Sequence, residues 1–256
     1  MTILHSVDFG PRDAQPVVFL GSIASTTDMW LPQLDSLSKD FRVIAIDHPG
    51  HGQSPDPQAL PGETTINDLA NNVLDTLDAL GVDEFDIVGL SLGGAIAQYL
   101  TATSGRVTKA VFMCTASNFG GPDKWAPRAE ETRAEGMKTR ARSAIELWLT
   151  PEYRATHPAL TDALTRMILS TRGEGYAAGA DALGGWDYTD ELRNITVPVL
   201  TISGAVDPST PPEVVHAIAE HVGGEAESIT LSSGGHVPTV EVPEEVTRAL
   251  RTFLSA

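Results

Sequence analysis

The stretch Gly89-Leu90-Ser91-Leu92-Gly93 is the most informative part of this sequence. It has the pattern G-x-S-x-G, in which a serine occupies a sharp turn between a β-strand and an α-helix. Small residues on both sides allow the chain to reverse tightly and present the serine hydroxyl. An apolar β run precedes the turn and a segment of helical composition follows it. We predict that Ser91 is a nucleophile. The alternative is a glycine-rich turn whose serine has no catalytic role.

On both sides of this turn, short apolar runs alternate with helical patterns. The predicted strands cover residues 16–20, 41–46, 85–90, 107–114, 197–202 and 227–231. The predicted helices cover residues 67–80, 95–103, 212–221 and 243–254. Such an alternation predicts an α/β fold with a mostly parallel central sheet flanked by helices and joined by right-handed crossovers.

The alternation stops between residues 118 and 189, where the sequence is helix-rich and has no apolar β run. A helical block between β/α units is typical of a cap that covers one end of the sheet. We therefore expect a core made of residues 1–117 and 190–256, and a helical cap, or lid, made of residues 118–189.

A serine hydroxyl becomes a useful nucleophile only when a base removes its proton, and an acid must orient that base. With this type of turn, the chain order is serine, acid, histidine. His236 follows the last predicted strand, and Asp207 follows the strand before it. Both positions lie at the carboxyl edge of the sheet, where open α/β folds bind ligands. We predict a catalytic triad in which His236 is the general base and Asp207 orients it.

Other candidates fit these two roles less well. His5 is expected on a first strand near the start of the chain, His48 and His51 precede Ser91, His157 lies in the cap, and His216 and His221 lie on a helix. A rival position for the acid follows the strand at residues 107–114, but residues 115–118 contain no carboxylate. The alternative is that the side chains of His236 and Asp207 form only structural hydrogen bonds.

Two backbone amides should form an oxyanion hole, one of them from the residue after the nucleophile. That residue is Leu92. The second amide should come from the loop after the strand at residues 16–20, where Ile23 is the best candidate. A separate turn at residues 47–54 carries His48 and His51 beside an aspartate; we interpret it as a turn fixed by glycines and internal hydrogen bonds rather than as a metal site.

Composition limits the partners and the compartment. The 256 residues carry a formal charge of −17, which disfavours nucleic acid and anionic membranes as partners. The sequence has neither a signal-peptide pattern nor an apolar stretch of membrane-spanning length, so we expect a cytoplasmic protein with no membrane partner. The single Cys114 excludes an internal disulfide. The sequence leaves the oligomeric state open.

With these motifs placed, the chain resembles the α/β-hydrolase superfamily over its whole length. Within it, the chain is most similar to the 3-oxoadipate enol-lactone hydrolases of aromatic catabolism. The closer likeness lies in the segments at residues 28–30, 133–137, 148–154, 174–177 and 204–212. The resemblance implies an α/β-hydrolase fold whose cap is inserted after the sixth strand. It also implies hydrolysis of a small ester or lactone through an acyl-enzyme, without a metal or organic cofactor.

Two positions differ from the pattern of these lactonases. The oxyanion loop reads Leu20-Gly21-Ser22-Ile23-Ala24 where a polar loop is usual, and Leu147 stands where an arginine often precedes the cap tryptophan.

The expected lactone carries a carboxylate, for which Arg133 is our candidate cation; a solvated helix-face charge is its alternative. Trp125 and Trp148 are candidates for the pocket wall or for cap packing. The alternative functions are a general carboxylesterase, a cofactor-free perhydrolase, and a non-catalytic small-molecule-binding protein on the same scaffold.

Overall fold

The computed structural model describes residues 1–256 and contains one sheet of seven strands. The strands are β1 (Ser6–Phe9), β2 (Pro16–Leu20), β3 (Arg42–Ile46), β4 (Phe85–Leu90), β5 (Val107–Met113), β6 (Val199–Ser203) and β7 (Ala226–Thr230). Their order across the sheet is β1-β3-β2-β4-β5-β6-β7. Strand β1 runs antiparallel to β3, and every other neighbouring pair is parallel. The prediction of a mostly parallel central sheet is confirmed.

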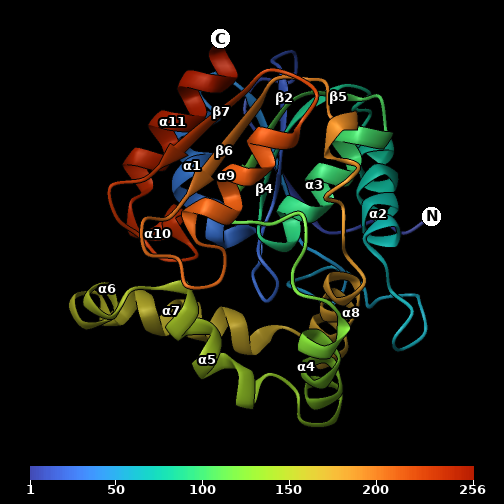
Figure 1. The fold of residues 1–256 in the computed structure, drawn as a ribbon, viewed down its shortest axis with the longest axis vertical. Helices are drawn as coiled ribbons and strands as arrows, with labels where there is room; N and C mark the ends of the chain where they lie inside the picture. The colour runs from blue at the N-terminus through green and yellow to red at the C-terminus, as the bar shows by residue number, and fades with distance from the viewer.

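Helices cover both faces of the sheet (Figure 1). Those outside the expected cap are α1 (Leu31–Leu37), α2 (Ile66–Ala79), α3 (Leu92–Thr103), α9 (Pro212–His221), α10 (Pro238–Glu241) and α11 (Pro243–Ser255), with short 3₁₀ helices η1 (Thr27–Trp30) and η2 (Leu192–Asn194). Helices α1 and α11 lie together on one face, and α2, α3 and α9 lie on the other. None of the helices combines the length and the apolar character that crossing a bilayer requires.

Because helices cover both faces of the sheet, its central strands consist mainly of continuous apolar residues rather than of alternating apolar and polar residues. All six residues of β4 and all five of β3 are buried, since helices pack on both faces. Strand β7, at the edge, keeps most of its residues exposed. Helix α2 begins at a capping box in which the Thr65 and Asp68 side chains each bond the other's backbone amide.

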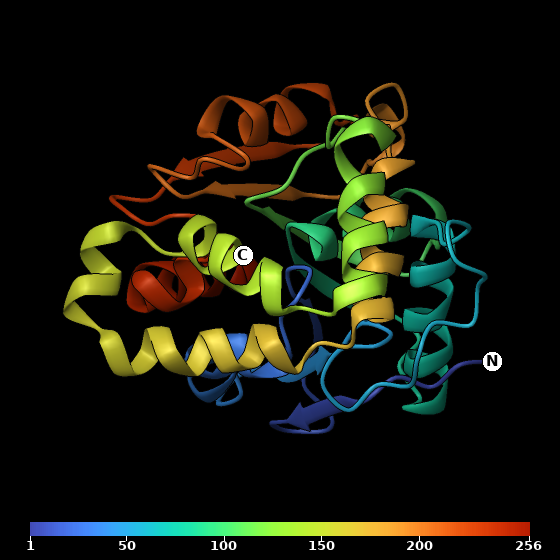
Figure 2. The same ribbon diagram turned by 90° about the horizontal axis from the view of Figure 1, so that it is seen from below.

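Between β5 and β6 the chain forms five α-helices in succession: α4 (Pro122–Glu135), α5 (Lys138–Trp148), α6 (Pro151–Thr156), α7 (Pro158–Ser170) and α8 (Gly173–Gly184). They lie at one end of the sheet, with α4 and α8 side by side (Figures 1 and 2). An isolated antiparallel bridge joins Asn118 to Asp187, so the segment leaves and rejoins the rest of the chain at one place. We keep the name cap for residues 118–189.

Two sequence-based expectations need correction. The cap follows the fifth strand in chain order rather than the sixth, because only β1 precedes β2 and the sheet has seven strands. His5, expected on the first strand, lies just before β1. Its Nδ1 instead lies 2.7 Å from Asp47 Oδ2 in the turn after β3.

Candidate active site

The turn between β4 and α3 holds Ser91 in a conformation that few residues adopt. Its backbone angles are φ 57° and ψ −114°. A Cβ atom on Gly89 would lie 2.2 Å from the carbonyl oxygen of Gly93, and one on Gly93 would lie 2.1 Å from that of Leu20. These glycines are therefore required by close backbone approach. A residue held in such a conformation costs about 1–3 kcal/mol, and such residues cluster at functional sites.

His236 and Asp207 meet in the loops after β7 and β6. The Nδ1 atom of His236 lies 2.8 Å from Oδ2 of Asp207. The Thr210 hydroxyl donates to the same oxygen (2.7 Å), and the amides of Ser209 (2.8 Å) and Thr210 (3.2 Å) donate to Oδ1. Because Nδ1 is occupied, Nε2 is the ring nitrogen of His236 that is free to exchange a proton with another group.

The surroundings of Asp207 keep it ionised. Burial alone would raise its pKa, but the charge of His236 and the hydrogen bonds from His236, Thr210 and the Ser209 amide outweigh this effect. The pKa of Asp207 is therefore below its ordinary value. An ionised carboxylate fixed by four hydrogen bonds can orient the imidazole and stabilise a positive charge on it.

Ser91 and His236 line the same cavity, which has a volume of about 110 Å³ and lies between the carboxyl edge of the sheet and the cap. Asp207 does not line it; its carboxylate is buried beyond the imidazole. The structure thus places Ser91 and His236 at one cavity and joins His236 to Asp207, with the three residues following β4, β7 and β6. The cavity is smaller than the pockets that hold drug-sized ligands, which favours a small reactant.

The predicted oxyanion residues also lie at this cavity. Ile23 lines it, together with its neighbours Ser22 and Ala24. The amide of Ile23 donates to no protein acceptor, and Leu92 is the first residue of α3, so its amide has no acceptor within the helix. The side chains of Ile23 and Leu92 both lie against Gly179 of α8, where an added Cβ would meet them at 3.0 and 3.1 Å.

The cap supplies the opposite wall of the cavity. Trp125 of α4 and Trp148 of α5, both predicted from the sequence, line it and are buried. Trp148 also anchors the histidine loop, because its carbonyl accepts from the Val237 amide at 3.1 Å. Leu147, which stands where the lactonase pattern has an arginine, lines the cavity with an apolar side chain.

Two arginines that the sequence analysis missed line the cavity: Arg128 of α4 and Arg140 of α5. The Arg128 guanidinium lies 4.8 Å from the ring centroid of Trp125 and has no carboxylate within salt-bridge distance. Arg140 pairs with Glu131. The spacing of Trp125 and Arg128 was a usable signal, because residues three apart share one face of a helix.

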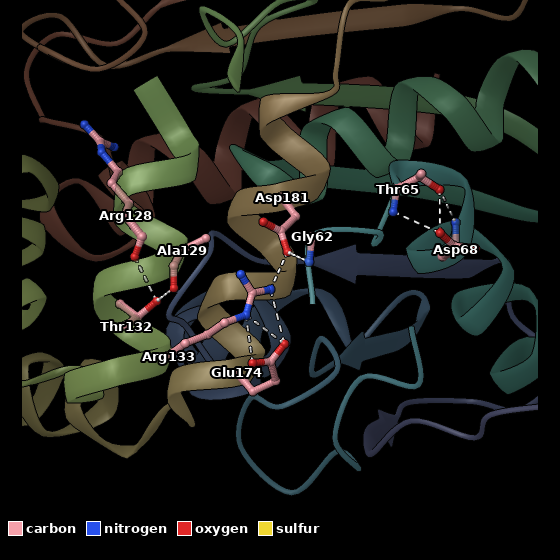
Figure 3. A network of polar contacts seen from close by, with 9 residues as sticks. All are labelled: Gly62, Thr65, Asp68, Arg128, Ala129, Thr132, Arg133, Glu174 and Asp181. Atoms are coloured by element: carbon pink, nitrogen blue, oxygen red, sulfur yellow. Dashed lines mark hydrogen bonds and ion pairs between the residues drawn. The ribbon is translucent and has the colours of Figure 1, made fainter. Parts of the chain in front are cut away.

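Arg133, the cation predicted from the sequence, does not line the cavity, and this is a correction. Its guanidinium pairs with Glu174 at 2.9 Å and with Asp181, both on α8 (Figure 3). Asp181 also accepts from the Gly62 amide at 3.0 Å, which links the cap to the loop before α2. Arg133 is five residues beyond Arg128 on α4, which places it about 140° further around the helix axis, so it points towards α8 and not towards the substrate space.

We expect Arg133→Met to lower the melting temperature by several degrees while leaving KM within about twofold of wild type. The substitution leaves the largely buried carboxylate of Asp181 without its cation, and a loss of about 1–3 kcal/mol is typical for such a group. Thermal unfolding and steady-state kinetics on one ester measure the two effects. A tenfold or larger rise in KM at an unchanged melting temperature would contradict this assignment.

Comparison with known proteins identifies the family of this chain. Residues 15–241 match the family described as alpha/beta hydrolase fold. The chain belongs to this family. It is therefore a hydrolase by fold and by relatives, with 28% identity to a 3-oxoadipate enol-lactonase of Acinetobacter baylyi over 98% of this chain and 92% of that protein. A carboxylesterase of Bacillus subtilis is also 28% identical, over 98% of this chain and 83% of that protein.

Among solved structures, this hydrolase is similar to the enol-lactonase from Burkholderia xenovorans. The two share 32% identity and superpose with a TM-score of 0.93, over 99% of this chain and 96% of that one. Lactonases and esterases therefore both occur among its relatives, and the choice between them depends on the cavity.

Proposed function

We propose that this hydrolase uses Ser91, His236 and Asp207 to open a small lactone that carries a carboxylate, with 3-oxoadipate enol-lactone as its best substrate. The observation that supports this most is the pairing of a serine–histidine site with two arginines in one small cavity. Glu131 pairs with Arg140, so Arg128 supplies the uncompensated positive charge of the wall. In a chain with a formal charge of −17, an unpaired cation at the cavity favours an anionic substrate.

In the first half of the reaction, Nε2 of His236 takes the proton from Ser91 while the Ser91 oxygen attacks the lactone carbonyl. The negative charge that develops on the carbonyl oxygen is stabilised by the amides of Ile23 and Leu92. The tetrahedral intermediate collapses, the ring C–O bond breaks, and the leaving enolate oxygen receives the proton from His236. The product stays attached to Ser91 as an acyl ester.

In the second half, His236 takes a proton from water, and the resulting hydroxide attacks the acyl ester. Collapse of this second intermediate returns the proton to Ser91 and releases the carboxylic acid; the enol then converts to the ketone. Asp207 stays ionised throughout and stabilises the imidazolium in both halves. Each step uses only side chains and amides of this chain, together with water.

The substrate carboxylate would bind at Arg128 and Arg140, on the cap side of the cavity. Arg128 suits this role because no protein carboxylate neutralises it, and a planar guanidinium can hold a carboxylate through two parallel hydrogen bonds. Tyr176 lines the same wall; burial raises its pKa, so its hydroxyl stays protonated and able to donate. The apolar surfaces of Trp125 and Trp148 would enclose the rest of the ring.

We expect Arg128→Met to raise KM for the enol-lactone by about 10- to 100-fold and to change KM for a neutral aryl ester by less than threefold. A hydrogen-bonded charge pair contributes about 1.5–3 kcal/mol, and only the anionic substrate forms it. Arg142→Met is the matched control, because Arg142 is on the same cap, is 89% exposed and does not line the cavity. Equal changes in KM for both substrates would argue against a carboxylate at Arg128.

The substrate assignment is tested by comparing kcat/KM for the enol-lactone, for simple lactones and for neutral aryl esters. We expect the enol-lactone to be preferred by at least about 100-fold, the equivalent of one buried charge pair. A preference for neutral esters would instead identify a carboxylesterase, the other activity found among the relatives.

A further inference from the structure

His51 is a fully buried titratable residue for which the proposed mechanism has no use. It lies in the turn after β3 and does not line the cavity. Its Nδ1 is 2.9 Å from the Pro49 carbonyl oxygen, which can only accept, so Nδ1 carries the proton. Nε2 is then an acceptor, and it receives the hydrogen bond of the Ala24 amide at 3.0 Å.

Nε2 of His51 accepts this bond from a strained residue of the oxyanion loop. Ser25 donates its amide to the Ser22 carbonyl at 3.1 Å, closing a four-residue turn with Ile23 and Ala24 at its centre. Ala24 has φ 69°, a region that favours glycine at the third position of a type II turn. An alanine there is strained, so the turn needs an external contact to hold the Ile23–Ala24 peptide in this orientation. The bond to His51 is that contact.

Gly21, the residue before Ser22, is also fixed by a histidine of the turn after β3. Nε2 of His48 donates to the Gly21 carbonyl at 2.8 Å, and the Gly93 amide of α3 donates to the same oxygen at 3.0 Å. The backbone is thus fixed on both sides of Ile23, at Gly21 and at Ala24. The rings of His48 and His51 lie edge to face, with centroids 5.6 Å apart.

We propose that His51 is a positioning residue that sets the oxyanion loop, so that the Ile23 amide faces the reacting carbonyl. This inference rests on the proposed function, because it takes Ile23 to be an oxyanion donor. His51 touches no reacting atom; it acts through the Ala24 amide alone. Burial, with a smaller contribution from His48, lowers the pKa of His51 to about 3, so Nε2 remains an acceptor at any pH where the enzyme would work.

The test is a pair of substitutions that separate the two hydrogen bonds of the ring. His51→Gln can place an oxygen near the position of Nε2 and keep the acceptor for Ala24. His51→Asn ends near the position of Nδ1, so it can keep the bond to Pro49 but cannot reach the Ala24 amide. Both substitutions introduce a polar amide into the same buried site, which makes their costs in stability comparable.

We expect His51→Asn to lower kcat by about 10- to 100-fold with KM within threefold, because one oxyanion donor contributes about 10²–10³ and here it is displaced rather than removed. The decrease in log kcat for His51→Gln should be at most half of the decrease for His51→Asn. His216→Leu is the control for destabilisation alone: His216 is on α9, outside the cavity, and should lower the melting temperature without lowering kcat.

The proposal is overturned if His51→Asn folds and keeps the kcat of wild type, or if Gln and Asn lower kcat equally. If His51→Asn does not fold, the same pair is compared in an Ala24→Gly background, where glycine relieves the strain at φ 69° but leaves the peptide freer to rotate. The acceptor at position 51 is then still needed to fix the peptide, so equal kcat values for Gln and Asn overturn the proposal there. Failure of the proposed function is distinguishable, because Ser91→Ala would then retain activity whatever residue occupies position 51.

Discussion

Ser91→Ala is expected to lower kcat by about 10³- to 10⁶-fold on every ester or lactone that the wild-type enzyme hydrolyses. Without the hydroxyl no acyl-enzyme can form, and the remaining rate comes only from binding and from the oxyanion amides. The alanine fits the turn, because Ser91 makes no side-chain cap to α3 and the strained backbone depends on Gly89 and Gly93. Steady-state kinetics at pH 7 measure the loss.

Labelling with a fluorophosphonate provides the control for this variant. The wild-type chain should gain the mass of one phosphonyl group at Ser91, and Ser91→Ala should gain none. Ser117→Ala, at a serine outside the cavity, should behave as wild type in both assays. Hydrolysis by Ser91→Ala within tenfold of wild type would show that the nucleophile is another group, and would end the assignment of the triad.

Asp207→Asn is expected to have the second largest effect, a loss of about 10⁴-fold in kcat. The asparagine can present an N–H to Nδ1 of His236, which would move the ring proton to Nε2 and leave no base facing Ser91. It also removes the negative charge that stabilises the imidazolium. The geometry should survive, since asparagine has the size of aspartate and its oxygen can still accept from the Thr210 hydroxyl or the Ser209 amide.

The pH dependence of stability gives an independent readout for the same variant. The folded-state pKa of Asp207 is lowered, so the ionised group stabilises the fold above its unfolded pKa of about 3.9. That contribution is lost as the pH falls through the folded pKa. The difference in melting temperature between wild type and Asp207→Asn should therefore shrink below about pH 4. A kcat within tenfold of wild type would contradict the role of Asp207; Asp190→Asn, at an exposed position, is the control.

Local pattern predicted most of the core, because a parallel sheet buried on both faces requires unbroken apolar runs. The predicted strands at residues 16–20 and 85–90 and the predicted helix at residues 212–221 coincide with β2, β4 and α9. The other predicted elements differ from the structure by one to three residues at one or both ends. Several short elements outside the cap were not predicted, among them α1, which has seven residues, and α10, which has four. Short or half-exposed segments carry too little periodicity to be recognised.

By itself the sequence determined the fold class and the three residues of the candidate triad. The strained turn at Ser91 requires glycines on both sides, and the acid and the histidine follow apolar strands in a fixed chain order, so each of them can be recognised in local sequence. Only the tertiary structure decided which cations meet the cavity. Arg128 and Arg133 are five residues apart on one helix, and α8 supplies two carboxylates to Arg133 and none to Arg128. The same holds for His51, whose acceptor role depends on an amide 27 residues earlier in the chain. A side chain's partners across elements follow from packing, which no local pattern encodes.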